Sequence, residues 1–161
     1  GQIFNAYFEE CNEKKPSLWI EPGKSIIGNA GIFLTRVTGI KKSYKTFIGV
    51  DAGMEALMRP ALYGAYHRIY KVGNPTAPTV QTVDITGRIC ENTDRLAVNR
   101  EFPEVQEGDL LAVMDAGAYC FSMSHQFCTR PRAAEVLLSG KDTRLIRNRE
   151  NIEDIFRNCH V

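Results

Sequence analysis

The spacing of apolar residues changes near residue 30, and this change constrains the fold of the chain more than any other feature of its sequence. Before that point an apolar stripe recurs at helical spacing over residues 3–11, and a short apolar run follows at 18–20. The run predicts a buried strand, which ends at a loop containing Gly23. A helix, an apolar strand and a glycine loop are typical of one βα step in a parallel sheet or barrel. Because Gly1 and Gln2 offer no N-cap, we expect this helix to begin further upstream.

After residue 30 the sequence is typical of a mainly-β domain. Short segments rich in Val, Ile, Thr and Tyr are separated by Gly, Pro and Asn, which favours a β-barrel or sandwich. We therefore divide the chain into residues 1–30, the remnant of an α/β unit, and residues 31–161, a C-terminal β-domain. The pattern predicts strands at 32–41, 46–50, 65–72, 79–90, 110–115 and 133–139, short helices at 54–58 and 118–127, and a closing helix at 151–158 capped by Asn148 or Asn151.

The composition argues against several classes of function. The 161 residues include 20 Lys+Arg and 19 Asp+Glu, a net charge of +1, which removes the electrostatic basis for nucleic-acid binding. The longest apolar runs are far shorter than the roughly 18 residues of a membrane span. The five cysteines are irregularly spaced without a C-x-x-C pair, and the three histidines are scattered, so we expect neither a disulfide framework nor a metal site. With no leader at the N-terminus, we expect a cytoplasmic protein that binds neither nucleic acid nor membrane.

Two glycine-containing turns are candidates for binding an anion. Residues 21–25, Glu-Pro-Gly-Lys-Ser, open a predicted helix, where free backbone N–H groups, the helix dipole and Lys24 favour a phosphate. Residues 115–119, Asp-Ala-Gly-Ala-Tyr, follow the predicted strand at 110–114, and Tyr119 is able to hydrogen-bond the same group. Taken alone, each turn is more often an ordinary connection between a strand and a helix.

Two pairs of polar side chains are candidates for contacting a substrate. Arg59 and Tyr63 are four residues apart, so a turn or short helix presents both to one pocket, where a guanidinium suits a carboxylate. Cys90 and Glu91 end a predicted strand, and their thiol and carboxylate suit a proton donor and a partner for an ammonium. Local sequence alone favours simpler interpretations: a surface arginine beside a half-buried tyrosine, and a buried cysteine at a strand end.

Together and in this order, the segments resemble the diaminopimelate decarboxylases, within the fold III pyridoxal-phosphate decarboxylases related to alanine racemase. The resemblance covers residues 19–138. It implies an N-terminal (β/α)8 barrel joined to a C-terminal β-domain, and a homodimer whose active site is shared across the interface. It also implies that the lysine holding the cofactor covalently lies upstream of this sequence. The segments that carry the resemblance are 21–25, 50–54, 59–67, 87–94, 108–113, 115–119 and 130–136.

The same resemblance implies a role for each candidate residue. Residues Glu21, Pro22, Gly23 and Lys24 match the loop that binds the phosphate of pyridoxal 5'-phosphate, which agrees with the usual phosphate site of such barrels. Lys24, Arg59 and Tyr63 match the contacts to the distal end of the amino-acid substrate. Cys90 matches the proton donor and Glu91 the anchor of the distal ammonium, both lent to the neighbouring subunit. Tyr119 matches a contact to both cofactor and substrate.

The sequence departs from the usual motifs of the family at several positions. Lys24 stands where the family has Arg, so a point charge replaces a planar fork that donates two aligned hydrogen bonds. Asn92 and Thr93 replace Ser and Gly, and Cys120 and Cys128 stand where Gly and Asn are common. None of these changes removes a chemical role.

The resulting functional hypothesis is the decarboxylation of meso-2,6-diaminopimelate to L-lysine and CO2, the last step of lysine biosynthesis, by an enzyme of which this chain is the C-terminal part. Two alternatives stay open: a related decarboxylase with another amino-acid substrate, and a non-catalytic C-terminal dimerisation module. An enzyme is favoured over a non-catalytic module because all five candidate residues are present, namely Arg59, Tyr63, Cys90, Glu91 and Tyr119. Without the barrel lysine we expect the chain alone to be inactive.

Overall fold

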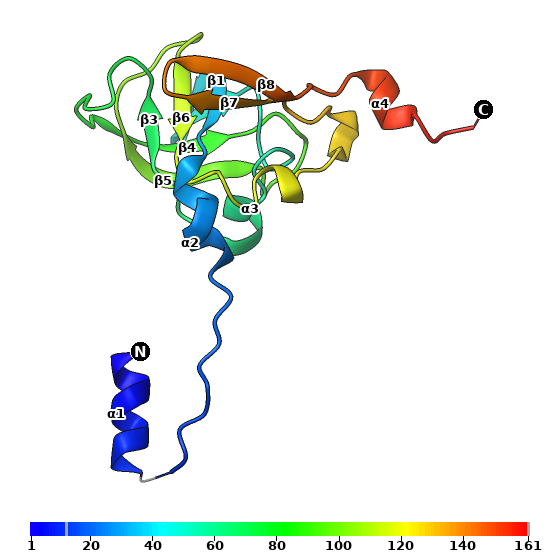
Figure 1. Cartoon of the computed structure of the whole chain (residues 1–161). Coiled ribbons are helices and arrows are strands. Elements are labelled where there is room, and N and C mark those ends of the chain that lie inside the picture. Colours follow the sequence, from blue (N-terminus) through cyan, green and yellow to red (C-terminus); the bar gives the residue numbers. More distant parts are fainter. Residues whose placement is uncertain (12, 161) are drawn as a thin grey trace.

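A six-stranded sheet forms the centre of the molecule in the computed structural model, which describes residues 1–11 and 13–160 (Figure 1). Its strand order is β3-β6-β1-β2-β4-β5, in which the β2–β4 pair is parallel and the other pairs are antiparallel. A separate two-stranded sheet joins β7 to β8, and the predicted mainly-β class is confirmed. The strands are β1 (Phe33–Lys42), β2 (Thr46–Val50), β3 (Ile69–Lys71), β4 (Gln81–Thr86), β5 (Arg95–Phe102), β6 (Leu110–Val113), β7 (Glu135–Ser139) and β8 (Asp142–Arg147).

Strand β1 shows how the sequence sets the orientation of the sheet. Phe33, Thr35 and Val37 are buried and the residues between them are exposed, as the two-residue period of a strand requires. Phe33 pairs with Val113 of β6, and Val37 pairs with Val50 of β2, so buried residues stand opposite one another on both sides. The register of the three central strands therefore follows from their apolar pattern.

The connection between β2 and β4 brings distant residues into the core. Parallel neighbours need a crossover, and here the chain leaves β2, forms β3 at the far edge of the sheet and returns as β4. The crossover contains the short helix α3 (Arg59–Tyr63). It also carries Leu57 and His67, both of which are fully buried. The imidazole ring of His67 is thus placed within an apolar core.

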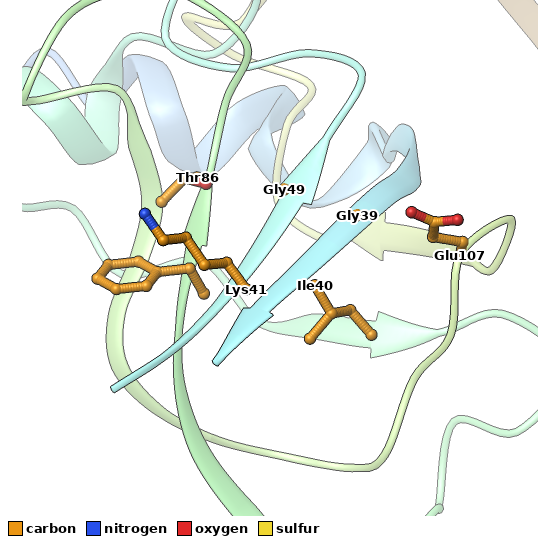
Figure 2. Close-up of a pocket in the computed structure, with 7 residues that line it drawn as sticks. Gly39, Ile40, Lys41, Gly49, Thr86 and Glu107 are labelled. Carbon is orange, nitrogen blue, oxygen red and sulfur yellow. The ribbon is translucent and has the colours of Figure 1, made fainter. Parts of the chain in front are cut away.

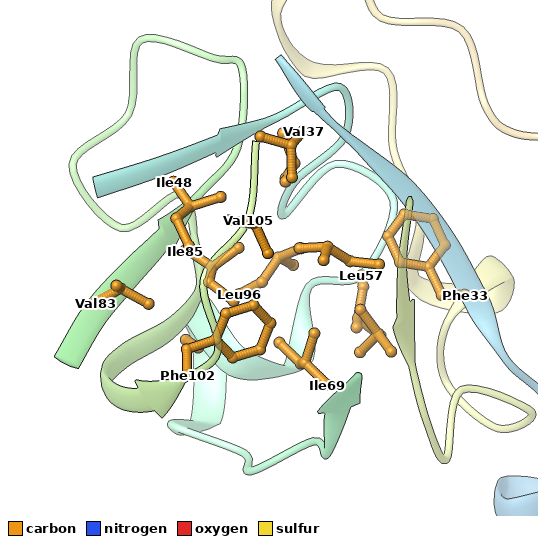
Figure 3. Packing of buried hydrophobic residues seen from close by; sticks show 14 of the residues in the cluster. Phe33, Val37, Ile48, Leu57, Ile69, Val83, Ile85, Leu96, Phe102 and Val105 are labelled. Atoms are coloured by element: carbon orange, nitrogen blue, oxygen red, sulfur yellow. The ribbon is translucent and has the colours of Figure 1, made fainter. Parts of the chain in front are cut away.

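The core lies inside the curve of the sheet, with strands on several sides of it (Figure 3). Its side chains are aliphatic apart from two phenylalanines, and burial of this area is the main favourable term in folding. The larger members are Phe33, Val37, Ile48, Val50, Leu57, Ile69, Val83, Ile85, Leu96, Phe102, Val105, Leu111 and Val113.

The N-terminal segment differs from the predicted βα step. Helix α1 (Gln2–Glu10) forms as predicted, but it has no buried residue and stands apart from the sheet (Figure 1). The strand predicted at 18–20 is absent, and Trp19 is 89% exposed. A strand exists only when its backbone N–H and C=O groups pair with a neighbour, and the described residues offer this run none. The prediction of a strand there is wrong for this chain taken by itself.

Several smaller predictions also need correction. Residues 54–58 contain a turn rather than a helix, and residues 118–127 contain only the 3-10 turn η2 (Phe121–Met123) and the first residue of η3 (Phe127–Thr129). Strands β5 and β8 were not predicted, because β5 carries a left-handed Asn99 that interrupts its alternation and β8 is exposed throughout. The closing helix is confirmed as α4 (Ile152–Phe156), with a capping box between Asn151 and Asp154.

Candidate functional site

The predicted anion loop and Tyr119 meet at one place. The loop leads into α2 (Gly23–Ile27), and the hydroxyl of Tyr119 lies only 2.2 Å from the position that a Cβ on Gly23 would occupy. Only glycine leaves room for this contact. Tyr119 is 45% exposed and has a left-handed backbone with φ of 58°, which is uncommon for a residue other than glycine. Two segments nearly a hundred residues apart therefore share one surface.

The loop itself is tighter than the sequence suggests. The Gly23 N–H donates to the Glu21 carbonyl at 2.9 Å, and the Ser25 N–H and hydroxyl donate to the Pro22 carbonyl at 2.9 and 2.7 Å. These two N–H groups are thus not free for an anion, contrary to our expectation, because the turn at Pro22 satisfies them internally. The loop also carries the ammonium of Lys24, and the hydroxyl of Tyr119 contacts the loop at Gly23.

A glycine seam fixes this loop to the sheet. After α2 and the turn η1 (Gly28–Ala30), the Gly117 N–H donates to the Gly28 carbonyl and the Ala116 N–H to the Gly31 carbonyl, each at 2.9 Å. A Cβ on Gly117 would lie 1.9 Å from the Ile27 carbonyl oxygen, and a Cβ on Gly31 would lie 2.4 Å from the Gly117 backbone. The two backbones approach this closely because neither has a side chain there.

Arg59 is held by a buried histidine. Its Nη1 lies 3.1 Å from Nε2 of His67, whose Nδ1 lies 2.8 Å from the Met114 carbonyl oxygen. A guanidinium only donates, so Nε2 accepts from Arg59, and Nδ1 carries the proton that it donates to Met114. Burial lowers the pKa of His67, the charges of Arg59 and Lys24 lower it further, and the Met114 carbonyl opposes them. The imidazole is therefore neutral, and the three basic side chains lie in one neighbourhood.

Tyr63 lies on the same short helix as Arg59 but faces solvent. It is the last residue of α3 and is 65% exposed, and the helix ends at Gly64 in the left-handed conformation with φ of 62°. The predicted spacing of four residues thus does place both side chains on one helical turn. The hydroxyl of Tyr63 is accessible from outside the fold.

The second predicted group, Cys90 and Glu91, lies on a loop that Asp94 organises. The Asp94 carboxylate accepts the N–H groups of Met54 at 2.7 Å and Ile89 at 3.0 Å. It fills the space that a Cβ would need on Gly53 or Gly87, at 2.0 and 2.2 Å. Burial raises the pKa of this carboxyl group, while the two N–H donors oppose the rise. Asp94 thereby fixes the loop of residues 87–94 against the turn at 53–54.

The two side chains carried by this loop make different contacts. Glu91 Oε1 accepts the N–H and hydroxyl of Thr93 at 3.1 and 3.0 Å, and these bonds lower its pKa. The Sγ of Cys90 lies 3.9 Å from the Sγ of Cys128, and both thiols are exposed. No hydrogen bond found among the described residues joins this pair to Lys24, Arg59 or Tyr119. The predicted residues thus form two groups, one around α2 and α3 and one around Cys90.

Three residues near these groups had no role in the sequence analysis. His67 stands in a quoted motif, but only the structure shows that it holds Arg59. The only sign of Asp94 in the sequence is the glycine at positions 53 and 87. These glycines leave room for its carboxylate, which is evident only once the fold brings the three residues together. Cys128 was noted as a departure, without a link to Cys90. Each contact joins segments far apart in the chain, so local pattern could not predict it.

Left-handed backbone is concentrated beside the same residues. Among the described residues other than glycine, φ is positive at Asp115, Tyr119, Cys128, Thr129 and Asn99. Four of these five lie in the two loops that contact Gly23 and Cys90. Such conformations cost free energy and cluster at functional sites, which favours a functional use of both loops.

A hollow on the sheet lies away from these residues (Figure 2). It measures about 520 Å³ and is bounded by strands β1, β2 and β4. None of the predicted site residues lines it. Its lining residues are Gly39, Ile40, Lys41, Phe47, Gly49, Thr86 and Glu107.

The chain is similar to known proteins along most of its length. Residues 11–117 match the family described as "Pyridoxal-dependent decarboxylase, C-terminal sheet domain". A diaminopimelate decarboxylase of Methanothermobacter thermautotrophicus is 44% identical over 99% of this chain and 37% of the relative. One from Aquifex aeolicus is 51% identical over 88% of this chain and 34% of the relative.

Solved structures agree with this similarity. The crystal structure of diaminopimelate decarboxylase from M. jannaschii in co-complex with L-lysine superposes with a TM-score of 0.82 at 36% identity. The match covers 99% of this chain and 37% of that one. The chain thus spans little more than a third of the length of the relatives it matches.

Proposed function

This chain belongs to the pyridoxal-dependent decarboxylases, as their C-terminal sheet domain, and from that premise we propose that it completes the active site of an enzyme that converts meso-diaminopimelate to L-lysine and CO2. The N-terminal (β/α)8 barrel and its cofactor lysine are part of this proposal, with residues 1–30 as the end of the barrel and residues 31–161 as the β-domain. The relatives' names and the lysine bound to the M. jannaschii enzyme support this choice of substrate.

The observation that carries the proposal is the contact between Tyr119 and Gly23. A tyrosine hydroxyl packs against a bare glycine in the loop that also carries Lys24, and a hydroxyl and an ammonium suit the phosphate of pyridoxal 5'-phosphate. The residues present therefore fit the cofactor, although the turn leaves the charge and the hydroxyl, rather than the Gly23 and Ser25 N–H groups, to bind it. Bound there, the cofactor supplies the electron sink that lets the carboxylate depart.

The chain's own residues orient the substrate and return a proton. Arg59, fixed by the neutral His67, presents its remaining donors to the distal carboxylate, and Tyr63 adds an exposed hydroxyl. Glu91, whose lowered pKa keeps it ionised, pairs with the distal ammonium. The Cys90 thiol donates the proton that replaces the lost carboxylate. Cys90 and Glu91 serve the site of the neighbouring subunit in a homodimer.

The experiment is a substrate comparison with the complete enzyme. We expect CO2 and L-lysine from meso-diaminopimelate, with a higher kcat/KM than for L-ornithine, L-arginine or L-lysine. Arg59→Ala removes a charge-assisted contact worth about 1.5–3 kcal/mol, so kcat/KM for diaminopimelate falls by roughly 10- to 150-fold. Arg59→Lys, which keeps the charge, loses less. No release of CO2 from diaminopimelate by the cofactor-loaded enzyme contradicts the proposal.

Lys24 favours one second candidate, a decarboxylase of a substrate with a different distal group. A lysine offers a single point charge where the family has a planar fork. Lys24→Arg keeps or raises kcat/KM if the distal group is a carboxylate. A steep loss on diaminopimelate, together with better turnover of another amino acid, favours the second candidate.

A further inference from the structure

Cys90 and Cys128 form a pair of facing thiols. Their Sγ atoms are 3.9 Å apart, although the residues are 38 positions apart in the chain. Both side chains are exposed, and they come from separate loops, one held by Asp94 and one formed by η3. The described residues contain no other contact between two cysteine sulfurs. The close approach of two sulfurs is therefore specific to these two loops, and the other cysteines of the described residues do not share it.

The pair suits a reversible disulfide better than a metal ion. The described residues hold no group of three His, Cys, Asp or Glu side chains able to bind a metal, so the two sulfurs lack further ligands. A disulfide needs a sulfur separation of about 2.05 Å. The sulfurs must approach by roughly 2 Å, which rotation about the Cα–Cβ bonds of two exposed cysteines supplies.

We propose that Cys90 and Cys128 are an oxidation site at which a hydroperoxide converts the two thiols to a disulfide. The Cys90 thiolate attacks the peroxide, the O–O bond breaks, and a sulfenic acid and one molecule of water or alcohol form. The Cys128 thiol then attacks the Cys90 sulfur, the S–O bond breaks, and a second water leaves as the S–S bond forms. The two sulfurs together lose two electrons, which the peroxide accepts.

Cys128 is the resolving thiol in this scheme. Desolvation and its hydrogen bond with Cys90 raise the pKa of the Cys128 thiol, which disfavours its thiolate. We assign the first attack to Cys90, and the facing sulfurs, 3.9 Å apart, allow Cys128 to resolve the sulfenic acid. The position of Cys128 protects Cys90 from further, irreversible oxidation, because a sulfenic acid that forms a disulfide does not proceed to sulfinic acid.

Cys120 is the internal contrast for this site. Its thiol donates to the Ala56 carbonyl at 3.4 Å, and burial raises its pKa to about 11. A half-buried, protonated thiol such as this one reacts slowly with peroxide. Cys11 and Cys159 are exposed, like Cys90, and test whether exposure alone is enough.

The disulfide would switch off the proposed decarboxylation, a consequence that rests on the function of Cys90 proposed above. With its sulfur bonded to Cys128, Cys90 has no proton to donate. A dithiol reductant restores both thiols and with them the activity. The existence of the disulfide itself does not depend on that function.

The test is peroxide treatment of the complete enzyme, followed by a tryptic digest without reductant. We expect the loss of two of the five thiols of the chain and a cross-link between the peptides 89–95 and 101–132. The second peptide also contains Cys120, so the Cys120→Ser variant must keep the cross-link. The Cys128→Asn variant must lose it, and asparagine tolerates the left-handed backbone at this position, φ 55°.

The activity of the same samples separates this proposal from the proposed function. Wild type, Cys11→Ser and Cys159→Ser lose activity with excess peroxide and recover with dithiothreitol. Cys128→Asn loses activity without recovering it, because excess peroxide oxidises its Cys90 sulfenic acid to sulfinic acid. A cross-link with unchanged activity supports the oxidation site and contradicts Cys90 as proton donor. Absence of the cross-link from wild type, or its persistence in Cys128→Asn, overturns the oxidation site.

Discussion

The N-terminal segment, residues 1–27, and the six-stranded sheet contain similar apolar residues but bury them very differently. Trp19 is 89% exposed and Ile20 is 72% exposed, whereas Ile48 and Phe102 are at most 1% exposed. Both regions have a clear apolar pattern. The sheet buries its apolar residues against its own strands and crossover, while no second layer covers the segment among the residues that the structure describes. A pattern therefore predicts a local conformation, but burial requires a partner surface.

The same contrast divides the candidate site. Lys24 belongs to the segment, whose Gly23 contacts the hydroxyl of Tyr119 in its own chain and whose end the glycine seam fixes. Cys90 belongs to the sheet, and its sulfur faces Cys128. The candidate residues thus form two separate groups, which is the arrangement expected if each group completes a different site of a dimer. The predictions below test this division.

The largest effect is expected from Cys90→Ala in the complete enzyme, which should lower kcat by about 10²–10⁴-fold, the usual contribution of a positioned general acid. Mixing these subunits with subunits that lack the barrel lysine should restore roughly a quarter of wild-type activity, because about half the dimers are hybrids with one intact site of two. If subunits exchange and no activity returns, Cys90 acts within its own chain or is not the proton donor.

The next effect concerns stability and separates the two regions directly. Phe102→Ala in the sheet should lower the free energy of unfolding of the 161-residue chain by about 3–5 kcal/mol. Trp19→Ala in the segment should change it by less than about 0.5 kcal/mol. Urea unfolding curves of both variants measure the difference. A similar loss in both would show that Trp19 is buried in solution and that the contrast between the regions is wrong.

A smaller effect is expected at the seam that joins the regions. Gly117→Ala forces a Cβ to within 1.9 Å of the Ile27 carbonyl oxygen, and such overpacking costs about 1–3 kcal/mol. The backbone must then shift, and trypsin should cut faster after Lys24. Gly49→Ala is the matched control, since its Cβ would meet nothing closer than 3.5 Å. Equal cleavage rates in both variants would show that the seam does not hold the segment.

The smallest effect is a pH dependence that His67 gives to the fold. Its pKa is lowered in the folded state, so the unfolded chain binds a proton more readily, and stability present above about pH 6.5 is lost as the pH falls through the folded pKa. Burial is the main cause of the lowered pKa, the charges of Arg59 and Lys24 add to it, and Asp115 opposes it. We expect Tm to fall between pH 7 and pH 5, and to fall less in His67→Gln. An identical fall in the variant would contradict this assignment.

The sequence by itself determined the class of fold, and it predicted most of the residues that we place in the candidate site. Strands β1, β2, β4 and β6 follow from short apolar and β-branched runs, and α4 follows from its capping box, because these signals act within a few residues. The ordered motifs, from residues 21–25 to 130–136, likewise gave the family to which the chain belongs.

Only the tertiary structure decided which residues meet. It placed the Tyr119 hydroxyl over Gly23, made His67 the neutral partner of Arg59, and brought Cys128 to Cys90. It also left residues 18–20 without the strand that their apolar character predicts. The physical reason is the same in every case: these contacts join backbones or side chains that are distant in the chain, and a strand or a buried polar group is stable only when a partner supplies its hydrogen bonds.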